Sequence, residues 1–150
     1  MTLQSPNSLR NIYLADDDDD DRIMFVEALQ EVDSSVILTQ AEDGKQLMDI
    51  LNENSDPLPE VVFLDINMPK LDGFECLEEI KQHTRLKKLF VIMLSTSSDP
   101  ITIEKAFDLG ATFYAVKPST FDELKSLIRN VLHMDWLSLE KQNRREFRLI

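Results

Sequence analysis

The chain has 150 residues, of which 43% are hydrophobic, so it can bury the core of one domain and is not globally disordered. Its formal net charge of −12 repels phosphate backbones, which argues against nucleic-acid binding by the surface as a whole. No apolar run suits a signal peptide or a membrane span, and one cysteine allows no internal disulfide, so we expect a cytoplasmic protein away from the membrane.

The polar residues 1–9 predict a flexible N-terminus, and the segment after them alternates between strand and helix patterns. Five short apolar runs predict strands: NIYLA at 11–15, VILTQA at 36–41, VVFL at 61–64, LFVIML at 89–94 and TFYAV at 112–116. The third and fourth runs are continuously apolar, which is typical of strands that are buried on both faces.

Helix signals lie between these runs and after the last one. The aspartates of residues 18–21 stand where a first helix begins, and carboxylates there can cap free N–H groups. Asp99 before Pro100 predicts the start of the fourth helix, and Thr120 with Glu123 predicts a capping box at the fifth. Strict alternation implies a doubly wound α/β fold, in which a five-stranded parallel sheet lies between two layers of helices.

Polar residues follow the predicted strands at the edge where such folds bind ligands. Asp16 and Asp17 come after the first strand, Asp65 after the third, Ser95 after the fourth and Lys117 after the fifth. If these strands are neighbours, three carboxylates, one hydroxyl and one ammonium converge at a single place.

The residue types in this group favour magnesium and phosphoryl chemistry. Three close carboxylates must shift their pKa values or bind a cation, and an all-oxygen ligand set suits Mg²⁺. Histidine and cysteine are absent from these loops, which disfavours zinc and copper. With Mg²⁺ bound, the cluster and Lys117 can neutralise the oxygens of a phosphoryl group, and a carboxylate nucleophile would form an aspartyl phosphate.

Four stretches of the chain resemble the receiver domains of two-component response regulators, over roughly residues 10–132. They are YLADD at the end of the first strand, FLDINMPKLDG around Asp65, MLST at Ser95 and GATFYAVKP at Lys117. By analogy with the chemotaxis receiver, the resemblance implies a flavodoxin-like sheet with strand order 2-1-3-4-5. The fourth helix, fifth strand and fifth helix would form the surface that a partner reads.

The resemblance also implies a role for each residue of the acidic group. Asp65 would be the phosphoacceptor. Asp17 and Asp65 would ligate Mg²⁺ directly, together with the backbone carbonyl of Asn67, and Asp16 would act through water. The metal site would therefore be assembled from the ends of the first and third strands.

The remaining roles concern the fourth and fifth strands. Ser95 would hydrogen-bond a phosphoryl oxygen, and Lys117 would pair with the phosphate. Tyr114 would be the aromatic switch whose rotamer follows the movement of Ser95, and the peptide bond before Pro118 would be cis. Ordinary strand packing is the alternative for Tyr114, and a plain loop hydroxyl is the alternative for Ser95.

We therefore expect a stand-alone response regulator that is not an enzyme beyond its own phosphotransfer and slow autodephosphorylation. A sensor histidine kinase or a histidine phosphotransfer protein would be the donor, and an output protein would be the partner. The stretches LADDDDDDR and LSTSS also resemble short regulators, including ones beside phytochrome-like kinases.

Two other functions fit parts of the pattern. A phosphatase of the haloacid-dehalogenase type also uses an aspartate nucleophile with Mg²⁺, but it needs a second aspartate two positions later. That position is Asn67, which cannot protonate a leaving group. A pseudo-receiver that binds partners without phosphorylation is disfavoured because all the key residues are present.

Residues 133–150, HMDWLSLEKQNRREFRLI, extend beyond the expected domain. Trp136 and Leu139 continue the apolar stripe of the fifth helix, so the segment could lengthen that helix or fold back. It would then pack on the domain or on a second protomer, which makes a homodimer possible, and a solvated tail is the alternative. Eighteen residues are too few for a DNA-binding output domain.

Overall fold

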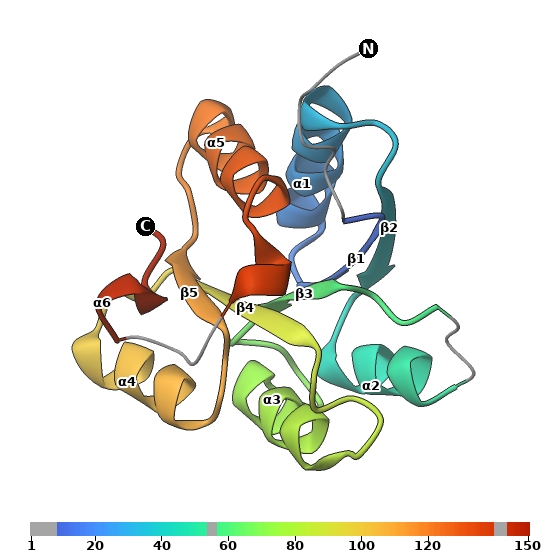
Figure 1. Cartoon of the computed structure of the whole chain (residues 1–150), viewed down its shortest axis with the longest axis vertical. Helices are drawn as coiled ribbons and strands as arrows, with labels where there is room; N and C mark the ends of the chain where they lie inside the picture. The colour runs from blue at the N-terminus through green and yellow to red at the C-terminus, as the bar shows by residue number, and fades with distance from the viewer. Residues whose placement is uncertain (1–8, 54–56, 140–143) are drawn as a thin grey trace.

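The computed structural model describes residues 9–53, 57–139 and 144–150. In these residues, five parallel strands form one sheet in the order β2-β1-β3-β4-β5, which confirms the predicted fold (Figure 1). The strands are β1 (Asn11–Ala15), β2 (Ile37–Ala41), β3 (Val61–Asp65), β4 (Phe90–Ser95) and β5 (Phe113–Val116). All five residues of β3 and the last five of β4 are buried, as their apolar runs predicted.

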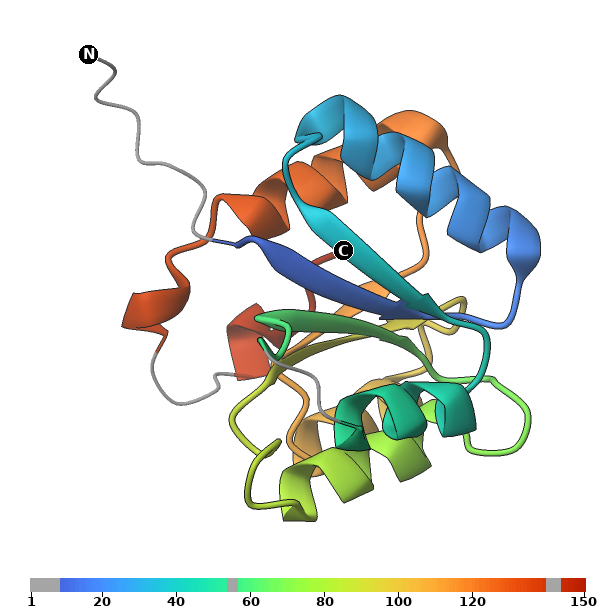
Figure 2. The ribbon, with the colours of Figure 1, turned by 90° about the vertical axis from the view of Figure 1, so that its right-hand side faces the viewer.

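Helices cover both faces of the sheet. On one face lie α1 (Asp19–Val32) and α5 (Phe121–Leu132), which contact each other. On the other face lie α2 (Gly44–Asn52), α3 (Gly73–Gln82) and α4 (Pro100–Asp108), as Figures 1 and 2 show. Each layer closes its own apolar core against the sheet. No helix in the described residues is both long and apolar enough to cross a membrane.

Side-chain caps define where the helices begin. Asp18 accepts a hydrogen bond from the backbone N–H of Asp21 and so starts α1 at the aspartate run. Asp99 caps α4, with Pro100 at its first position, and Thr120 caps α5, so both predicted starts are confirmed. Each cap satisfies a backbone donor that has no partner inside its helix, which sets the helix start from the sequence itself.

The predicted flexible N-terminus lies outside the described residues, apart from Leu9. The Leu9 side chain is buried in the core beneath α1 and α5, so ordered packing begins one residue before the boundary that we expected. The apolar character of this leucine is its only local signal, because its neighbours in the sequence are polar.

The segment after α5 folds back over the domain. A single 3-10 turn, η1 (Trp136–Ser138), buries Trp136, whose indole N–H donates to the carbonyl of Val131 at 2.9 Å. The indole ring also packs on Phe90 and Phe113, at the starts of β4 and β5. In Figure 2, η1 lies to the left of the sheet, opposite the end from which β1 leads into α1.

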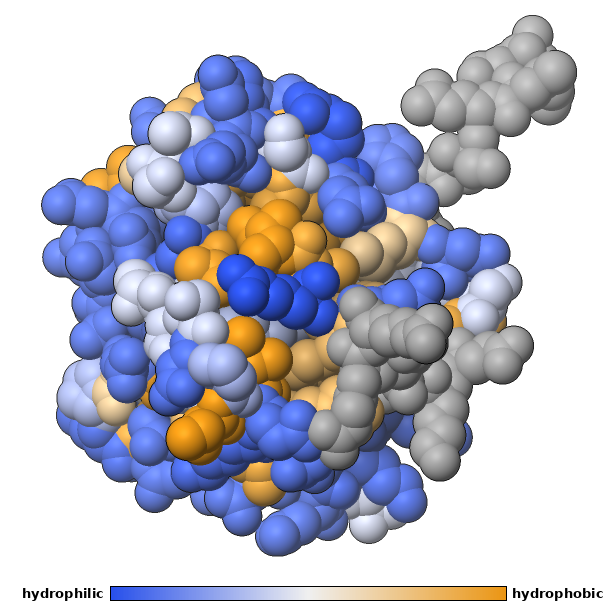
Figure 3. All heavy atoms as spheres, turned by 90° about the vertical axis from the view of Figure 1, so that its left-hand side faces the viewer, coloured by the Kyte–Doolittle hydropathy of each residue, from blue (hydrophilic) through white to orange (hydrophobic). Residues whose placement is uncertain are grey.

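A short helix, α6 (Arg144–Phe147), then brings the end of the chain to β5. The ring of Phe147 is buried, with its centroid 5.1 Å from that of Phe107 on α4. The N–H of Leu149 donates to the carbonyl of Tyr114 at 2.7 Å, and the N–H of Val116 donates to the carbonyl of Ile150. Residues 148–150 therefore lie along the outer edge of β5. On this side of the molecule, Figure 3 shows apolar surface on both sides of a strongly hydrophilic group near the middle.

Candidate functional site

The strand ends bring most of the predicted site residues together. Asp16 follows β1, Asp65 ends β3 and Ser95 ends β4, and these three strands are consecutive neighbours in the sheet. Among the described residues, the polar side chains buried with less than 5% exposure are those of Asp16, Asp65 and Ser95. Burying two carboxylates is costly unless charge or hydrogen bonds compensate, so this edge of the sheet is the natural place for a charged ligand.

The three carboxylates fit a small divalent cation. Asp16, Asp17 and Asp65 each offer one oxygen, and these oxygens all lie within 4.8 Å of one another. Ligands on opposite sides of Mg²⁺ are separated by about 4.2 Å, because each Mg–O distance is about 2.1 Å. Asp17 is exposed whereas the other two are buried, so water could complete such a site from the solvent side.

Lys117 lies among the same carboxylates. Its ammonium nitrogen is 3.0 Å from an oxygen of Asp16 and 3.3 Å from an oxygen of Asp65. A third carboxylate, that of Asp21, approaches it to 2.9 Å. The sequence assigned Asp21 only to the first turn of α1, because one aspartate within a run of six carries no local signal that distinguishes it from its neighbours.

Burial and charge set the protonation of this group. Burial raises the pKa of Asp65 to about 7, and the nearby Asp16 adds to the rise, while Lys117 opposes it. Burial acts to lower the pKa of Lys117, but Asp21, Asp65 and Asp16 outweigh it, so that pKa lies above its ordinary value. Lys117 is therefore charged at neutral pH, and one ammonium does not fully compensate the surrounding carboxylates.

Backbone contacts fix the loops that carry these groups. Arg22 donates a hydrogen bond to the carbonyl of Asp16 at 2.6 Å, and the N–H of Asp18 donates to the Asp16 carboxylate at 3.0 Å. In the loop after β3, a Cβ on Gly73 would come within 2.3 Å of the carbonyl oxygen of Asp65. Only glycine allows α3 to begin this close to the strand end, so the position of Asp65 depends on that close approach.

Ser95 and Tyr114 meet at the backbone of Ser97. The hydroxyl of Ser95 accepts a hydrogen bond from the N–H of Ser97 at 3.0 Å. Tyr114 on β5 is fully buried, and its hydroxyl donates to the carbonyl of Ser97 at 2.7 Å. The two residues are thus linked through one peptide segment after β4.

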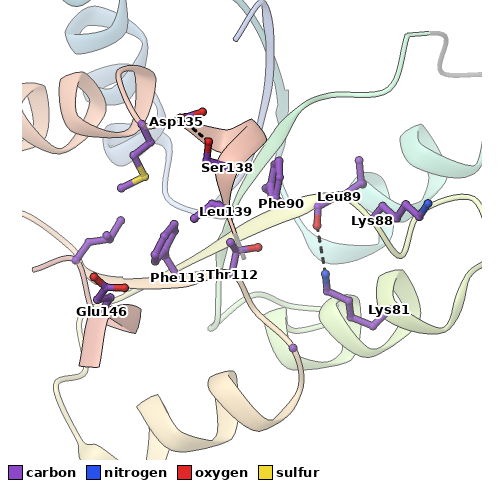
Figure 4. Close-up of a pocket in the computed structure, with 13 residues that line it drawn as sticks. Lys81, Lys88, Leu89, Phe90, Thr112, Phe113, Asp135, Ser138, Leu139 and Glu146 are labelled. Atoms are coloured by element: carbon purple, nitrogen blue, oxygen red, sulfur yellow. Dashed lines mark hydrogen bonds between the residues drawn. The ribbon is translucent and has the colours of Figure 1, made fainter. Parts of the chain in front are cut away.

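Asn67 and Pro118 flank the cluster. The N–H of Asn67 points to a carboxylate oxygen of Asp65 at 3.4 Å, and the Asn67 side chain is exposed. Pro118 follows Lys117 and lines a small hollow together with Asp16 and Asp21. A larger hollow, of about 780 Å³, lies instead between the starts of β4 and β5 and the segment after α5 (Figure 4). Since none of the strand-end residues lines it, it plays no part in this site.

Comparisons with known proteins agree with this arrangement. The model of the response regulator receiver domain matches residues 12–129. A Rhizobium etli protein named as a chemotaxis protein CheY is 32% identical, with 80% of this chain and 90% of that protein covered.

Solved structures of receivers superpose on the whole domain. The phosphorylated cyanobacterial phytochrome response regulator RcpA has a TM-score of 0.77 and 29% identity, covering 89% of this chain and 98% of that one. The Mn²⁺-bound form of response regulator Rcp1, a protein of Synechocystis, has a TM-score of 0.73 and 28% identity, covering 89% and 99%. With the family match across most of its length, this chain belongs to the response regulator receiver domain family of two-component signalling proteins.

Proposed function

We propose that this protein is a response regulator that accepts a phosphoryl group on Asp65 from a sensor histidine kinase or a histidine phosphotransfer protein. The observation that carries the proposal is the place of Asp65, which is buried beside two further carboxylates and within 3.3 Å of the ammonium of Lys117. Receiver domains are phosphoacceptor switches and bind Mg²⁺ at an acidic cluster of this kind.

The chemistry assigns distinct tasks to the site residues. A carboxylate oxygen of Asp65 attacks phosphorus while the N–P bond of the donor phosphohistidine breaks, which leaves an acyl phosphate on Asp65. Asp17, Asp65 and the carbonyl of Asn67 would hold Mg²⁺, with Asp16 acting through water. Bound Mg²⁺ would supply positive charge to the phosphoryl oxygens and keep Asp65 ionised near neutral pH.

The switch would run from the phosphoryl group to β5. Lys117 pairs with one phosphoryl oxygen, and the Ser95 hydroxyl donates to another after it leaves the N–H of Ser97. Because Tyr114 is bonded to the carbonyl of the same Ser97, movement of this segment changes the environment of Tyr114. The phosphorylated state would thereby favour a second conformer of the surface around α4, β5 and α5.

An output protein would read that surface, and a second copy of the chain is the other partner that this face could accept. Residues 148–150 lie along β5, so the partner would meet the end of the chain as well as the helices.

The test is incubation with acetyl phosphate, with and without Mg²⁺, followed by intact-mass measurement. The wild type should gain one phosphoryl group only when Mg²⁺ is present, and Asp65→Asn should gain none. Asp20→Asn is a matched control, since Asp20 is an exposed member of the same aspartate run. Mass is a better readout than the fluorescence of Trp136, which packs against the opposite ends of the strands.

A wild type that gains no mass, or an Asp65→Asn variant that gains as much as the wild type, would contradict the proposal.

Two other outcomes would point to the alternative functions. Rapid multiple turnover of small phosphate esters would indicate a phosphatase, although Asn67 offers no acid for the leaving group. Partner binding that is unchanged by Mg²⁺ and acetyl phosphate would indicate a pseudo-receiver.

A further inference from the structure

Asp21 pairs with Lys117, although it is neither a proposed metal ligand nor the proposed phosphoacceptor. Asp21 lies in the first turn of α1, and its carboxylate is 2.9 Å from the ammonium of Lys117, 96 residues away. This distance is no longer than those from Lys117 to Asp16 and Asp65, which are 3.0 and 3.3 Å. Asp21 is therefore a full member of the group of charges around Lys117.

The helix holds this carboxylate in place. The backbone N–H of Asp21 donates to the capping carboxylate of Asp18 at 3.0 Å, and the next residue, Arg22, is anchored to the carbonyl of Asp16. The Asp21 side chain is 39% exposed, so it reaches Lys117 from the solvent side of the site. Asp20, one residue earlier, is exposed, and its side chain makes no hydrogen bond or ion pair with any residue that the structure describes.

The ammonium of Lys117 has three N–H donors, and three carboxylates surround it. A phosphoryl group on Asp65 needs at least one of these donors, so one of the present acceptors has to give way. Asp16 and Asp65 belong to the cluster that would hold the metal, whereas Asp21 lies outside it. If Lys117 breaks its contact with Asp21, the carboxylates that would hold the metal keep their positions.

We propose that Asp21 is a positioning residue for the phosphotransfer described above, on which this inference rests: its carboxylate holds Lys117 in the resting site and competes with the incoming phosphoryl group for that ammonium. Asp21 thereby slows phosphorylation and sets how readily the switch responds to a phosphoryl donor. Hydrogen bonding to Asp21 is also the largest of the contacts that raise the pKa of Lys117 against the effect of burial.

The experiment compares Asp21→Asn with Asp20→Asn at saturating Mg²⁺. Both variants remove one charge from the same helical turn, but only the first weakens the pair with Lys117. Asp21→Asn should raise the rate of phosphorylation by acetyl phosphate about three- to fivefold and tighten beryllofluoride binding by a similar factor, as expected for a partly exposed ion pair. Asp20→Asn should change either quantity by less than about twofold.

Two further measurements distinguish an effect of the Asp21–Lys117 contact from an effect of net charge and from a change in the stability of α1. Raising NaCl to about 0.5 M should bring Asp20→Asn to the wild-type rate, while Asp21→Asn stays faster, because close pairs are screened less than distant charges. The NMR signal of the Lys117 side-chain ammonium should shift in Asp21→Asn and stay in place in Asp20→Asn, which a purely structural effect on α1 would not produce.

Equal rates for the two variants at both salt concentrations, or a slower Asp21→Asn, would overturn the inference. Its failure is distinct from failure of the proposed function. A wild type that takes no phosphoryl group on Asp65 contradicts both, whereas a wild type that is phosphorylated normally and is matched by Asp21→Asn contradicts only the role of Asp21.

Discussion

At the scale of single residues, the buried carboxyl group of Asp65 carries a cost in stability. Burial raises its pKa to about 7 from an ordinary value of 3.8. Between these two values the folded protein binds more protons than the unfolded chain, so the stability of the metal-free protein falls as the pH rises through that window. Above it, the folded state carries the full cost of an ionised, buried Asp65.

Replacing Asp65 with asparagine should remove this cost. Without Mg²⁺ at about pH 8, Asp65→Asn should raise the free energy of unfolding by about 2 to 4 kcal/mol, and the gain should vanish towards about pH 4, where the wild-type carboxyl is neutral. Urea unfolding at a series of pH values measures both quantities, with Asp20→Asn as the exposed control. A gain that is the same at both ends of the series would show that burial is not its cause.

At the scale of elements, the end of the chain packs against β5 and forms hydrogen bonds with its outer edge. Hydrogen bonds from residues 148–150 satisfy part of its outer edge, which would otherwise present unpaired backbone groups. Phe147 adds an aromatic contact, with its ring centroid 5.1 Å from that of Phe107 and 6.4 Å from that of Tyr114. α6 and the residues after it are thus part of the packing on the proposed output side.

Phe147→Ala should therefore lower the free energy of unfolding by about 2 to 3 kcal/mol. This is at or below the usual loss of about 3 to 5 kcal/mol for a buried phenylalanine, because the segment that carries Phe147 is short. Leu137→Ala in the same extension is the matched control, since Leu137 is 95% exposed and should change stability by less than about 0.5 kcal/mol. Urea unfolding of the two variants makes the comparison. Equal losses would mean that the end of the chain adds no stability through Phe147.

At the scale of the whole molecule, negative charge is in excess both overall and locally. The net charge of −12 opposes the compact state through self-repulsion, and the aspartate run concentrates part of it beside the cluster of Asp16, Asp17 and Asp65. A divalent cation at this cluster would relieve local repulsion that monovalent salt can only screen.

Mg²⁺ should consequently stabilise the protein more than NaCl of equal ionic strength. At about 100 times the dissociation constant, binding to the folded state adds about 2.7 kcal/mol to the free energy of unfolding. Asp17→Asn should lose most of this gain, whereas Asp20→Asn should keep it, and thermal unfolding in matched salts measures the difference. Equal gains in Mg²⁺ and NaCl would show that the acidic run acts only as diffuse charge.

Much of the fold and of the candidate site could be predicted because the signals are local. A continuously apolar run predicts a buried strand, and a capping residue such as Asp99 or Thr120 marks a helix start, whatever the rest of the chain does. The group of Asp16, Asp17, Asp65, Ser95 and Lys117 could be named because parallel strands bring their carboxyl ends to one edge. The strand order itself came from the resemblance of four motifs to a known family.

What the sequence determined by itself was therefore the alternation of strands and helices and the polar residues at the strand ends, since both depend on near neighbours. Only the tertiary structure decided that Asp21, alone among the similar aspartates of residues 18–21, pairs with Lys117. It also decided that Leu9 and Phe147 are buried and that residues 148–150 lie along β5. Such contacts join residues far apart in the chain, and packing geometry selects them among residues whose local patterns are alike.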